Sequence, residues 1–181
     1  LGTILAANLV SAADWPQWMG PNRDDDWTET GIIDEFPEKG PEFLWRMPIS
    51  GGFAGPAVVS GMVYVTDYMR SSGDNKPAPT RRNDLLGKER VLCLDAKTGE
   101  EIWKHEYDCN YTISYPAGPR CTPTVDDGRV FTLGAMGDLI CLDAAKGSVI
   151  WSKNLQRTYD APLPLWGYAG HPLAYKNLLI C

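Results

Sequence analysis

The sequence has few of the residues that usually build metal and redox centres. Its 181 residues include two histidines and five cysteines, and no Cys-x-x-Cys pair occurs among them. Structural zinc sites take cysteine and histidine in closely spaced pairs, so we assign no residue to a metal. The chain also lacks an excess of positive charge. Its net charge of −6 at pH 7 argues against general binding of nucleic acids through their phosphates.

Long apolar runs are missing as well, and no transmembrane span is expected. The first residues, 1–13, are apolar and end in small residues, as the end of a secretory signal does. A basic segment before them is missing, so a buried apolar strand or helix is the alternative. We expect the remnant of a secretory signal at 1–13, and therefore a periplasmic or extracellular protein.

One eleven-residue pattern occurs twice. Cys93–Trp103 reads CLDAKTGEEIW and Cys141–Trp151 reads CLDAAKGSVIW, 48 residues further along the chain. Both copies follow an apolar run, turn at an Asp-x-x-x-Gly sequence and end in tryptophan. Asp and Gly at these positions favour a tight hairpin turn. A fixed period of this length is typical of repeat proteins, in which each unit buries its apolar face against its neighbours.

A second hairpin pattern precedes each copy. It occurs at 55–65, 122–132 and 171–180. Each time one strand begins near a proline, the chain turns at Gly or Asn, and a second apolar strand follows. Two hairpins per period make a four-stranded antiparallel unit, so the predicted fold class is all-β, a β-propeller. Pro and Gly interrupt every window that could carry a helical period. We predict strands at 42–49, 53–59, 62–67, 89–95, 100–106, 119–125, 129–134, 138–143, 148–154, 168–174 and 177–181.

These strands amount to the outer strand of one blade, two complete blades and half of another. Known propellers carry about four to eight blades, so we expect a fragment of a longer protein. We divide the chain into 1–13, an N-terminal extension at 14–41 and a partial propeller at 42–181. An insertion loop is expected at 68–89, because its residues have loop composition and interrupt the repeat.

The repeat resembles the tryptophan-docking motif of pyrroloquinoline-quinone-type propellers, Ala-x-Asp-x-x-Thr-Gly-x-x-x-Trp. The resemblance covers residues 14–181, and 14–23 looks like the start of exported propellers of planctomycete-type bacteria. In that family the tryptophan packs between adjacent blades. The resemblance therefore implies a structural role for the residues that match the motif: Asp95, Thr98, Gly99, Trp103, Asp143, Gly147 and Trp151. Lys146 stands where the second copy should have threonine, Cys93 replaces the alanine, and 44–46 looks like a degenerate earlier copy.

The same resemblance implies two functions, and we weigh a third. One is a non-catalytic binding or scaffold module, similar to the propeller lipoprotein that assembles outer-membrane barrels, with a protein or glycan partner at the propeller face and no cofactor. The alternative is a dehydrogenase that uses pyrroloquinoline quinone with calcium to oxidise an alcohol or a sugar, the rest of its site lying in other blades. Some of those enzymes carry adjacent cysteines, which this sequence lacks. For a carbohydrate-binding or hydrolytic module, no paired carboxylates stand out. We favour the scaffold.

A ligand face is expected where the chain enters the first strand of each blade, next to the central channel. Two such segments, 111–120 and 165–171, are rich in aromatic rings and suit a flat or anionic ligand. The candidate binding residues are Tyr115, Arg120, Trp166, Tyr168 and His171, and no residue is assigned a catalytic role. The alternative is that the rings pack between blades, that Arg120 pairs with a carboxylate and that His171 is a satisfied polar residue.

The cysteines suggest two kinds of role. Cys93 and Cys141 occupy equivalent strand positions and are expected to be small buried residues. Cys109 and Cys121 flank the link between two blades, so they could pair in an oxidising compartment.

Overall fold

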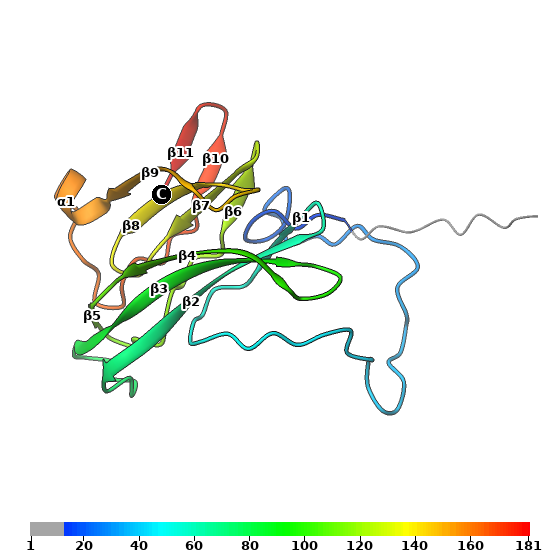
Figure 1. Ribbon diagram of the computed structural model, residues 1–181, viewed down its shortest axis with the longest axis horizontal. Coiled ribbons are helices and arrows are strands. Elements are labelled where there is room, and N and C mark those ends of the chain that lie inside the picture. The colour runs from blue at the N-terminus through cyan, green and yellow to red at the C-terminus, as the bar shows by residue number, and fades with distance from the viewer. Residues whose placement is uncertain (1–12) are drawn as a thin grey trace, which may run out of the picture.

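The computed structural model describes residues 13–181, and the expected signal remnant at 1–13 lies almost entirely outside them. Eleven strands and one short helix make up the described chain (Figure 1). They are β1 (Ala57–Val59), β2 (Met62–Gly73), β3 (Asn83–Asp95), β4 (Glu101–Asp108), β5 (Tyr111–Ile113), β6 (Thr124–Asp126), β7 (Arg129–Leu133), β8 (Asp138–Asp143), β9 (Val149–Asn154), α1 (Leu155–Tyr159), β10 (Leu173–Tyr175) and β11 (Leu178–Ile180).

The strands form successive antiparallel units. Blade 1 has the order β1-β2-β3-β4, with β5 also paired to β3, and blade 2 has the order β6-β7-β8-β9. The pair β10-β11 forms a separate C-terminal hairpin. Each four-stranded meander is a propeller blade, so the predicted all-β propeller fold is confirmed. β6 contacts β1 on one side and β10 on the other, so the first strands of the three units are neighbours.

Blade 1 and blade 2 share a buried interface at Trp103. The indole is 8% exposed, and its Nε1 donates to the carbonyl oxygen of Ala144 at 2.9 Å. Its ring covers Gly147, where a Cβ would come within 2.5 Å of the ring atoms. Gly147 has a φ of +69°, which glycine adopts without strain. Trp103 of one blade therefore requires the glycine in the turn of the next.

The expected strand at 42–49 is absent. Trp45 nevertheless reaches blade 1 in the same way as Trp103 reaches blade 2: its Nε1 donates to the carbonyl oxygen of Ala96 at 3.0 Å, and its ring lies 2.5 Å from the Cβ position of Gly99. A strand needs a neighbouring strand to pair its backbone groups, and no described residue pairs with 42–49. The contact of the Trp45 indole with blade 1 therefore forms although residues 42–49 are not paired as a strand.

The expected insertion loop at 68–89 is wrong in extent. β2 continues to Gly73 and β3 begins at Asn83, so the loop is confined to 74–82. Tyr68 and Leu85 are almost fully buried in this extension. β5, which the sequence did not reveal, pairs with the start of β3 and adds a third strand to the long hairpin (Figure 1). The unexpected helix α1 is a single short turn capped by Asn154, whose side chain accepts from the Arg157 amide.

All five cysteines are unpaired. Cys93 and Cys141 are buried, as expected from their equivalent positions in β3 and β8. Cys109 and Cys121 are also buried but belong to different apolar clusters, so the disulfide considered for them does not form. Burial raises the pKa of the Cys121 thiol to about 12.

The described chain contains no helix that is long and apolar enough to span a membrane.

Candidate functional site

An aromatic cleft of about 330 Å³ opens where three segments lead into the first strands of their units. The cleft is lined by Phe53, Tyr115, Arg120, Trp166 and Ala169, and we call this set the aromatic cleft. Phe53 precedes β1, Arg120 precedes β6 and Ala169 precedes β10. Each unit thus contributes to the wall, because the three first strands lie side by side. Three of the five predicted binding residues meet here.

Arg120 is held by backbone carbonyl groups. Its Nη2 donates to the carbonyl oxygens of Ser114 at 3.2 Å and Tyr115 at 2.6 Å, and its Nη1 donates to that of Gly118. The guanidinium lies 5.3 Å from the centroid of the Phe53 ring. No carboxylate of the described residues forms an ion pair with it, so the predicted carboxylate partner is absent. Burial lowers the pKa of Arg120 from its ordinary value, although a guanidinium remains protonated at neutral pH.

Two aromatic rings project over the cleft. Tyr115 and Trp166 meet edge to face, with ring centroids 6.2 Å apart. Tyr115 has a φ of +51°, an uncommon conformation for a residue with a side chain. Trp166 is 59% exposed, and its Nε1 lies 3.5 Å from the carbonyl oxygen of Pro79. An exposed indole beside a tyrosine ring and a partly buried guanidinium offers a flat apolar surface with one positive charge.

The loop that carries Trp166 is tied to blade 1. Arg82 donates from Nη2 to the carbonyl oxygen of Leu163 at 2.9 Å, and from Nη1 to those of Thr112 at 2.8 Å and Pro164 at 3.2 Å. The Ser114 amide donates to the Leu165 carbonyl at 2.8 Å. Hydrogen bonds to backbone groups therefore join the segment that carries Tyr115 to the loop that carries Trp166.

Tyr168 and His171 do not line the cleft. The Tyr168 hydroxyl donates to the carbonyl oxygens of Ala161 and Pro162, and its ring packs near Gly137. His171 Nδ1 accepts from the Thr122 amide at 2.9 Å. The structure thus brings Tyr115, Arg120 and Trp166 together. Tyr168 and His171 lie outside the cleft, in the segment between Trp166 and β10.

The residues of the repeat motif lie in the two hairpin turns. Asp95 Oδ1 accepts from the amides of Lys97 and Thr98, both at 2.8 Å, and these bonds hold the pKa of Asp95 below its usual value. Asp143 Oδ1 accepts from the amides of Ala145 at 3.0 Å and Lys146 at 2.8 Å. The turn therefore forms with either threonine or lysine three residues after the aspartate, because the backbone amide of that residue is the donor.

Trp151, which ends the second copy, is half-buried in the apolar cluster around Leu133 and Leu139. Its ring centroid lies 6.2 Å from that of Phe131.

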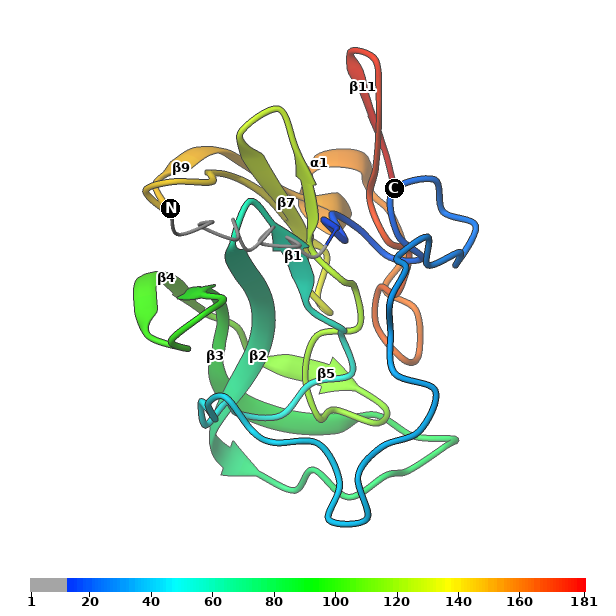
Figure 2. The same cartoon turned by 90° about the vertical axis from the view of Figure 1, so that its right-hand side faces the viewer.

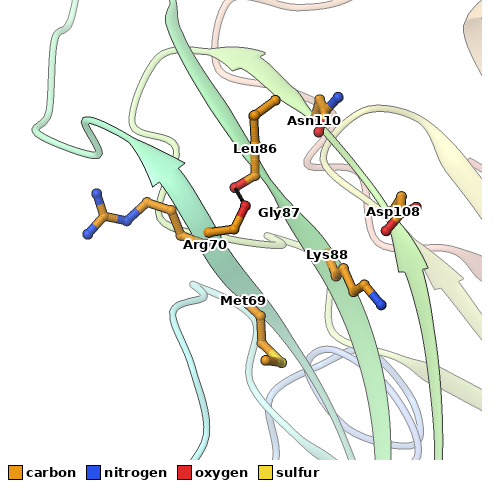
Figure 3. Close-up of a pocket in the computed structure, with 8 residues that line it drawn as sticks. Met69, Arg70, Leu86, Gly87, Lys88, Asp108 and Asn110 are labelled. Carbon is orange, nitrogen blue, oxygen red and sulfur yellow. Dashed lines mark hydrogen bonds between the residues drawn. The ribbon is translucent and has the colours of Figure 1, made fainter.

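A second hollow, of about 430 Å³, lies on the extended hairpin of blade 1 (Figure 3). It forms where β4 leaves β3 after the pair Lys88 and Asp108, before β5 joins β3 at Leu85. Arg70 and Lys88 bring positive charge to it, but Lys88 is already paired with Glu106 at 2.9 Å. This hollow depends on the extensions of β2 and β3, at positions where the sequence predicts a loop.

A buried carboxylate, that of Glu89, joins the two blades. Glu89 is 2% exposed and accepts from the hydroxyls of Tyr107 and Tyr111, the latter at 2.5 Å. Its Oε1 also accepts from the Ala135 amide of blade 2 at 2.9 Å. Burial raises the pKa of Glu89 and of both tyrosines. No pattern in the sequence distinguishes Glu89 from its charged neighbours Lys88 and Arg90, so its burial is visible only in the structure.

The residues of the aromatic cleft do not fit a calcium-bound quinone. Calcium prefers carboxylate, amide and carbonyl oxygens, and no carboxylate or amide side chain is among the five lining residues. Within residues 13–181, no group of three or more His, Cys, Asp or Glu side chains is arranged to hold a metal ion.

The successive four-stranded antiparallel blades, joined by an indole that packs on the next blade's turn, define a β-propeller repeat protein. A family model described as outer membrane protein assembly factor BamB matches residues 87–180, which is more than half of the chain. The chain belongs to this family of pyrroloquinoline-quinone-like propeller repeats.

Two curated relatives are similar in sequence. The quinohemoprotein alcohol dehydrogenase of Comamonas testosteroni is 22% identical over 188 residues, which cover 99% of this chain and 23% of the relative. The quinohemoprotein alcohol dehydrogenase ADH IIB of Pseudomonas putida is 31% identical over 97 residues, covering 50% of this chain and 13% of the relative. The chain thus spans less than a quarter of the length of either.

Two solved structures are similar to the chain. The crystal structure of quinohemoprotein alcohol dehydrogenase from Comamonas testosteroni has a TM-score of 0.43 at 24% identity, covering 72% of this chain and 17% of that one. The crystal structure of BamB from Moraxella catarrhalis has a TM-score of 0.36 at 18% identity, and the match covers 67% of this chain and 37% of that one.

Proposed function

We propose that this protein is a non-catalytic binding or scaffold module of the cell envelope and that the aromatic cleft receives a segment of a protein partner. The observation that carries the proposal is the lining of the cleft: exposed Phe53 and Trp166 stand beside Tyr115, with Arg120 as the one charged group. Tryptophan, tyrosine and arginine are the residues that most often dominate the binding energy of protein interfaces.

The state of Arg120 supports a binding role more than a reactive one. Three carbonyl oxygens already hold its guanidinium, and no titratable carboxylate, histidine or cysteine lines the cleft beside it. General acid–base catalysis most often uses a histidine or a carboxylate within hydrogen-bonding reach of the substrate, and neither lines the cleft. The five lining residues instead offer ring surface and a fixed charge, which suit recognition of an apolar or aromatic side chain next to a carbonyl or carboxylate oxygen.

The family description supports an envelope location and a protein partner. A matching model described as an outer membrane assembly factor agrees with export to the periplasm or to the outside of the cell, with the contacts of Trp103 and Trp45 serving as structural docking between blades. A glycan is the other partner that the aromatic surface would suit.

Site-specific photo-crosslinking of the full-length protein tests this function. A photoreactive phenylalanine analogue replaces Trp166 in the cleft or, in a matched control, Trp27, which is equally exposed at 58% against 59%. We expect crosslinks to one discrete envelope protein from position 166 and none from position 27, and we expect Tyr115→Ala to reduce them. Equal crosslinking from both positions would refute the cleft as the binding site.

A quinone-dependent dehydrogenase remains the second candidate, because both curated relatives are named quinohemoprotein alcohol dehydrogenases. Calorimetric titration of the full-length protein with pyrroloquinoline quinone and calcium, followed by a dye-coupled assay with alcohols and sugars, decides between the two. Saturable binding with dye reduction would replace the scaffold function by the enzyme. Absence of binding at high concentration is the result that the scaffold function predicts.

A further inference from the structure

Residues 14–26, which we call the N-terminal strap, contact the first strands of blades 1 and 2 and the segment that leads into β10. In Figures 1 and 2 this dark blue segment runs beside β1 and close to the segment that precedes β10. The strap contains no regular helix, and its only strand-like residue is the bridge residue Trp15. Its contacts therefore come from individual residues and backbone groups.

The first part of the strap pairs with blades 1 and 2. Trp15 forms an antiparallel bridge with Val58 of β1, with N···O distances of 2.7 and 2.9 Å for the two hydrogen bonds. The next residue, Pro16, accepts at its carbonyl oxygen from the Val125 amide of β6 at 2.8 Å. Asp14 Oδ1 accepts from the Ser60 amide at 2.8 Å. The strap thus satisfies backbone groups at the free edges of two neighbouring first strands.

The second part of the strap holds the segment that leads into β10. Arg23 Nη2 donates to the carbonyl oxygens of His171 at 3.0 Å and Pro172 at 2.8 Å. The indole of Trp18 stacks on the His171 imidazole with centroids 4.6 Å apart and planes 6° apart. The Arg23 guanidinium is itself oriented by Gln17, whose Oε1 accepts from Arg23 Nε at 3.2 Å.

His171 links the strap to the aromatic cleft. Its Nδ1 accepts from the Thr122 amide, and Thr122 lies two residues after Arg120 of the cleft. Two residues before His171, Ala169 lines the cleft, and Trp166 lies in the same loop. The segment that carries Arg120 and the loop that carries Trp166 and Ala169 therefore meet at the His171 imidazole. The indole of Trp18 in the strap stacks on this imidazole.

The strap keeps an uncommon backbone shape. Met19, Arg23 and Asp25 all have a positive φ, between 58° and 63°. Non-glycine residues keep this conformation only when surrounding contacts over-determine it. At Arg23 those contacts include the carbonyl oxygens of His171 and Pro172 and the side chain of Gln17.

The geometry points to the strap as the element that sets the shape of the aromatic cleft, with Arg23 and Trp18 as its positioning residues. This inference rests on the proposed function for its biological meaning, since a strap that moves would open or close the partner site. Releasing the strap frees the His171 loop and displaces Trp166 without touching any residue that lines the cleft.

Fluorine NMR of the full-length protein labelled with 5-fluorotryptophan tests the inference without any ligand. The Trp166 signal is assigned with Trp166→Phe, and the Trp103 signal reports on the interface between the blades. We expect Arg23→Ala to shift or broaden the Trp166 signal, to leave the Trp103 signal unchanged and to speed amide hydrogen exchange at Thr122 at least about tenfold. Arg23→Lys, whose ammonium can still donate to both carbonyl oxygens, is expected to restore the wild-type signal.

The control is Arg81→Ala, because Arg81 is exposed and its side chain forms no hydrogen bond or ion pair among residues 13–181. Wild-type Trp166 and Thr122 behaviour in Arg23→Ala would overturn the inference. If Arg23→Ala also alters the Trp103 signal, Trp18→Ala is judged by the same criteria and decides. Failure of the crosslinking experiment would leave these signals untouched, so the two proposals fail separately.

Discussion

Replacing Trp103 with alanine is expected to cost about 3–5 kcal/mol of unfolding free energy, the usual range for truncating a buried tryptophan. The side chain is 8% exposed and belongs to the apolar cluster that also contains Tyr64, Val91 and Leu142, so its loss opens a cavity between two blades. About 1 kcal/mol of this cost comes from the hydrogen bond to Ala144, which the truncation removes.

The carbonyl oxygen of Ala144 also accepts from the Tyr64 hydroxyl at 3.3 Å, so it keeps one partner after the substitution. Trp103→Phe keeps an aromatic ring but loses the indole donor and part of the fused ring system, so it leaves a smaller cavity than alanine does. We therefore expect Trp103→Phe to cost less than half as much as Trp103→Ala, because cavity formation is the larger contribution.

Urea denaturation of the full-length protein, followed by far-ultraviolet circular dichroism, measures these costs as shifts of the unfolding midpoint. Trp27→Ala is the matched control and is expected to change stability by no more than about 0.5 kcal/mol, since its ring is 58% exposed. Trp151→Ala should fall between the two, because Trp151 is half-buried. We also expect Trp103→Ala to destabilise the protein more than Arg120→Ala. A midpoint for Trp103→Ala that equals that of Trp27→Ala would refute the interblade role of the indole.

Three further predictions concern the turn, the buried carboxylate and the imidazole. Gly147→Ala should lower the thermal midpoint clearly, because its Cβ would meet the Trp103 ring at 2.5 Å from a backbone with positive φ; a midpoint equal to wild type would contradict this contact. Glu89→Gln should cost about 1–3 kcal/mol in urea denaturation, since an amide cannot accept all the hydrogen bonds that Tyr107 and its neighbours donate to the carboxylate. Burial lowers the pKa of His171, so the unfolded chain binds more protons there; its contribution to stability is full above pH 6.5 and is lost as the pH falls through the lower pKa of the folded state. The stability difference between wild type and His171→Gln should shrink over that pH window, and a difference independent of pH would exclude this role for the imidazole.

The sequence predicted the hairpins of the repeat well because their signals are local. The turn at Asp143 and Gly147 appears in the sequence as a spacing, and the strand predicted at 138–143 is observed with the same bounds as β8. The prediction failed where tertiary pairing decides. Residues 42–49 have strand-like composition but no neighbouring strand. Most of 68–89 has loop composition, yet its two ends pair with each other as the extensions of β2 and β3, and β5 pairs with the start of β3.

The candidate site was predicted in part for the same reason. Tyr115, Arg120 and Trp166 could be grouped because the repeat aligned the segments that carry them. Phe53 could not, because an isolated phenylalanine carries no positional signal until β1 is placed beside β6. The strap was equally invisible, since Arg23 contacts residues nearly 150 positions further along the chain.

The central claim is that the aromatic cleft binds a protein partner, and the most direct test is the affinity of the crosslinked partner for two tryptophan variants of the full-length protein. If the cleft is the interface, Trp166→Ala removes an anchor worth about 2 kcal/mol and weakens binding about thirtyfold, whereas Trp27→Ala binds like wild type. Equal affinity of the two variants for that partner would contradict the account.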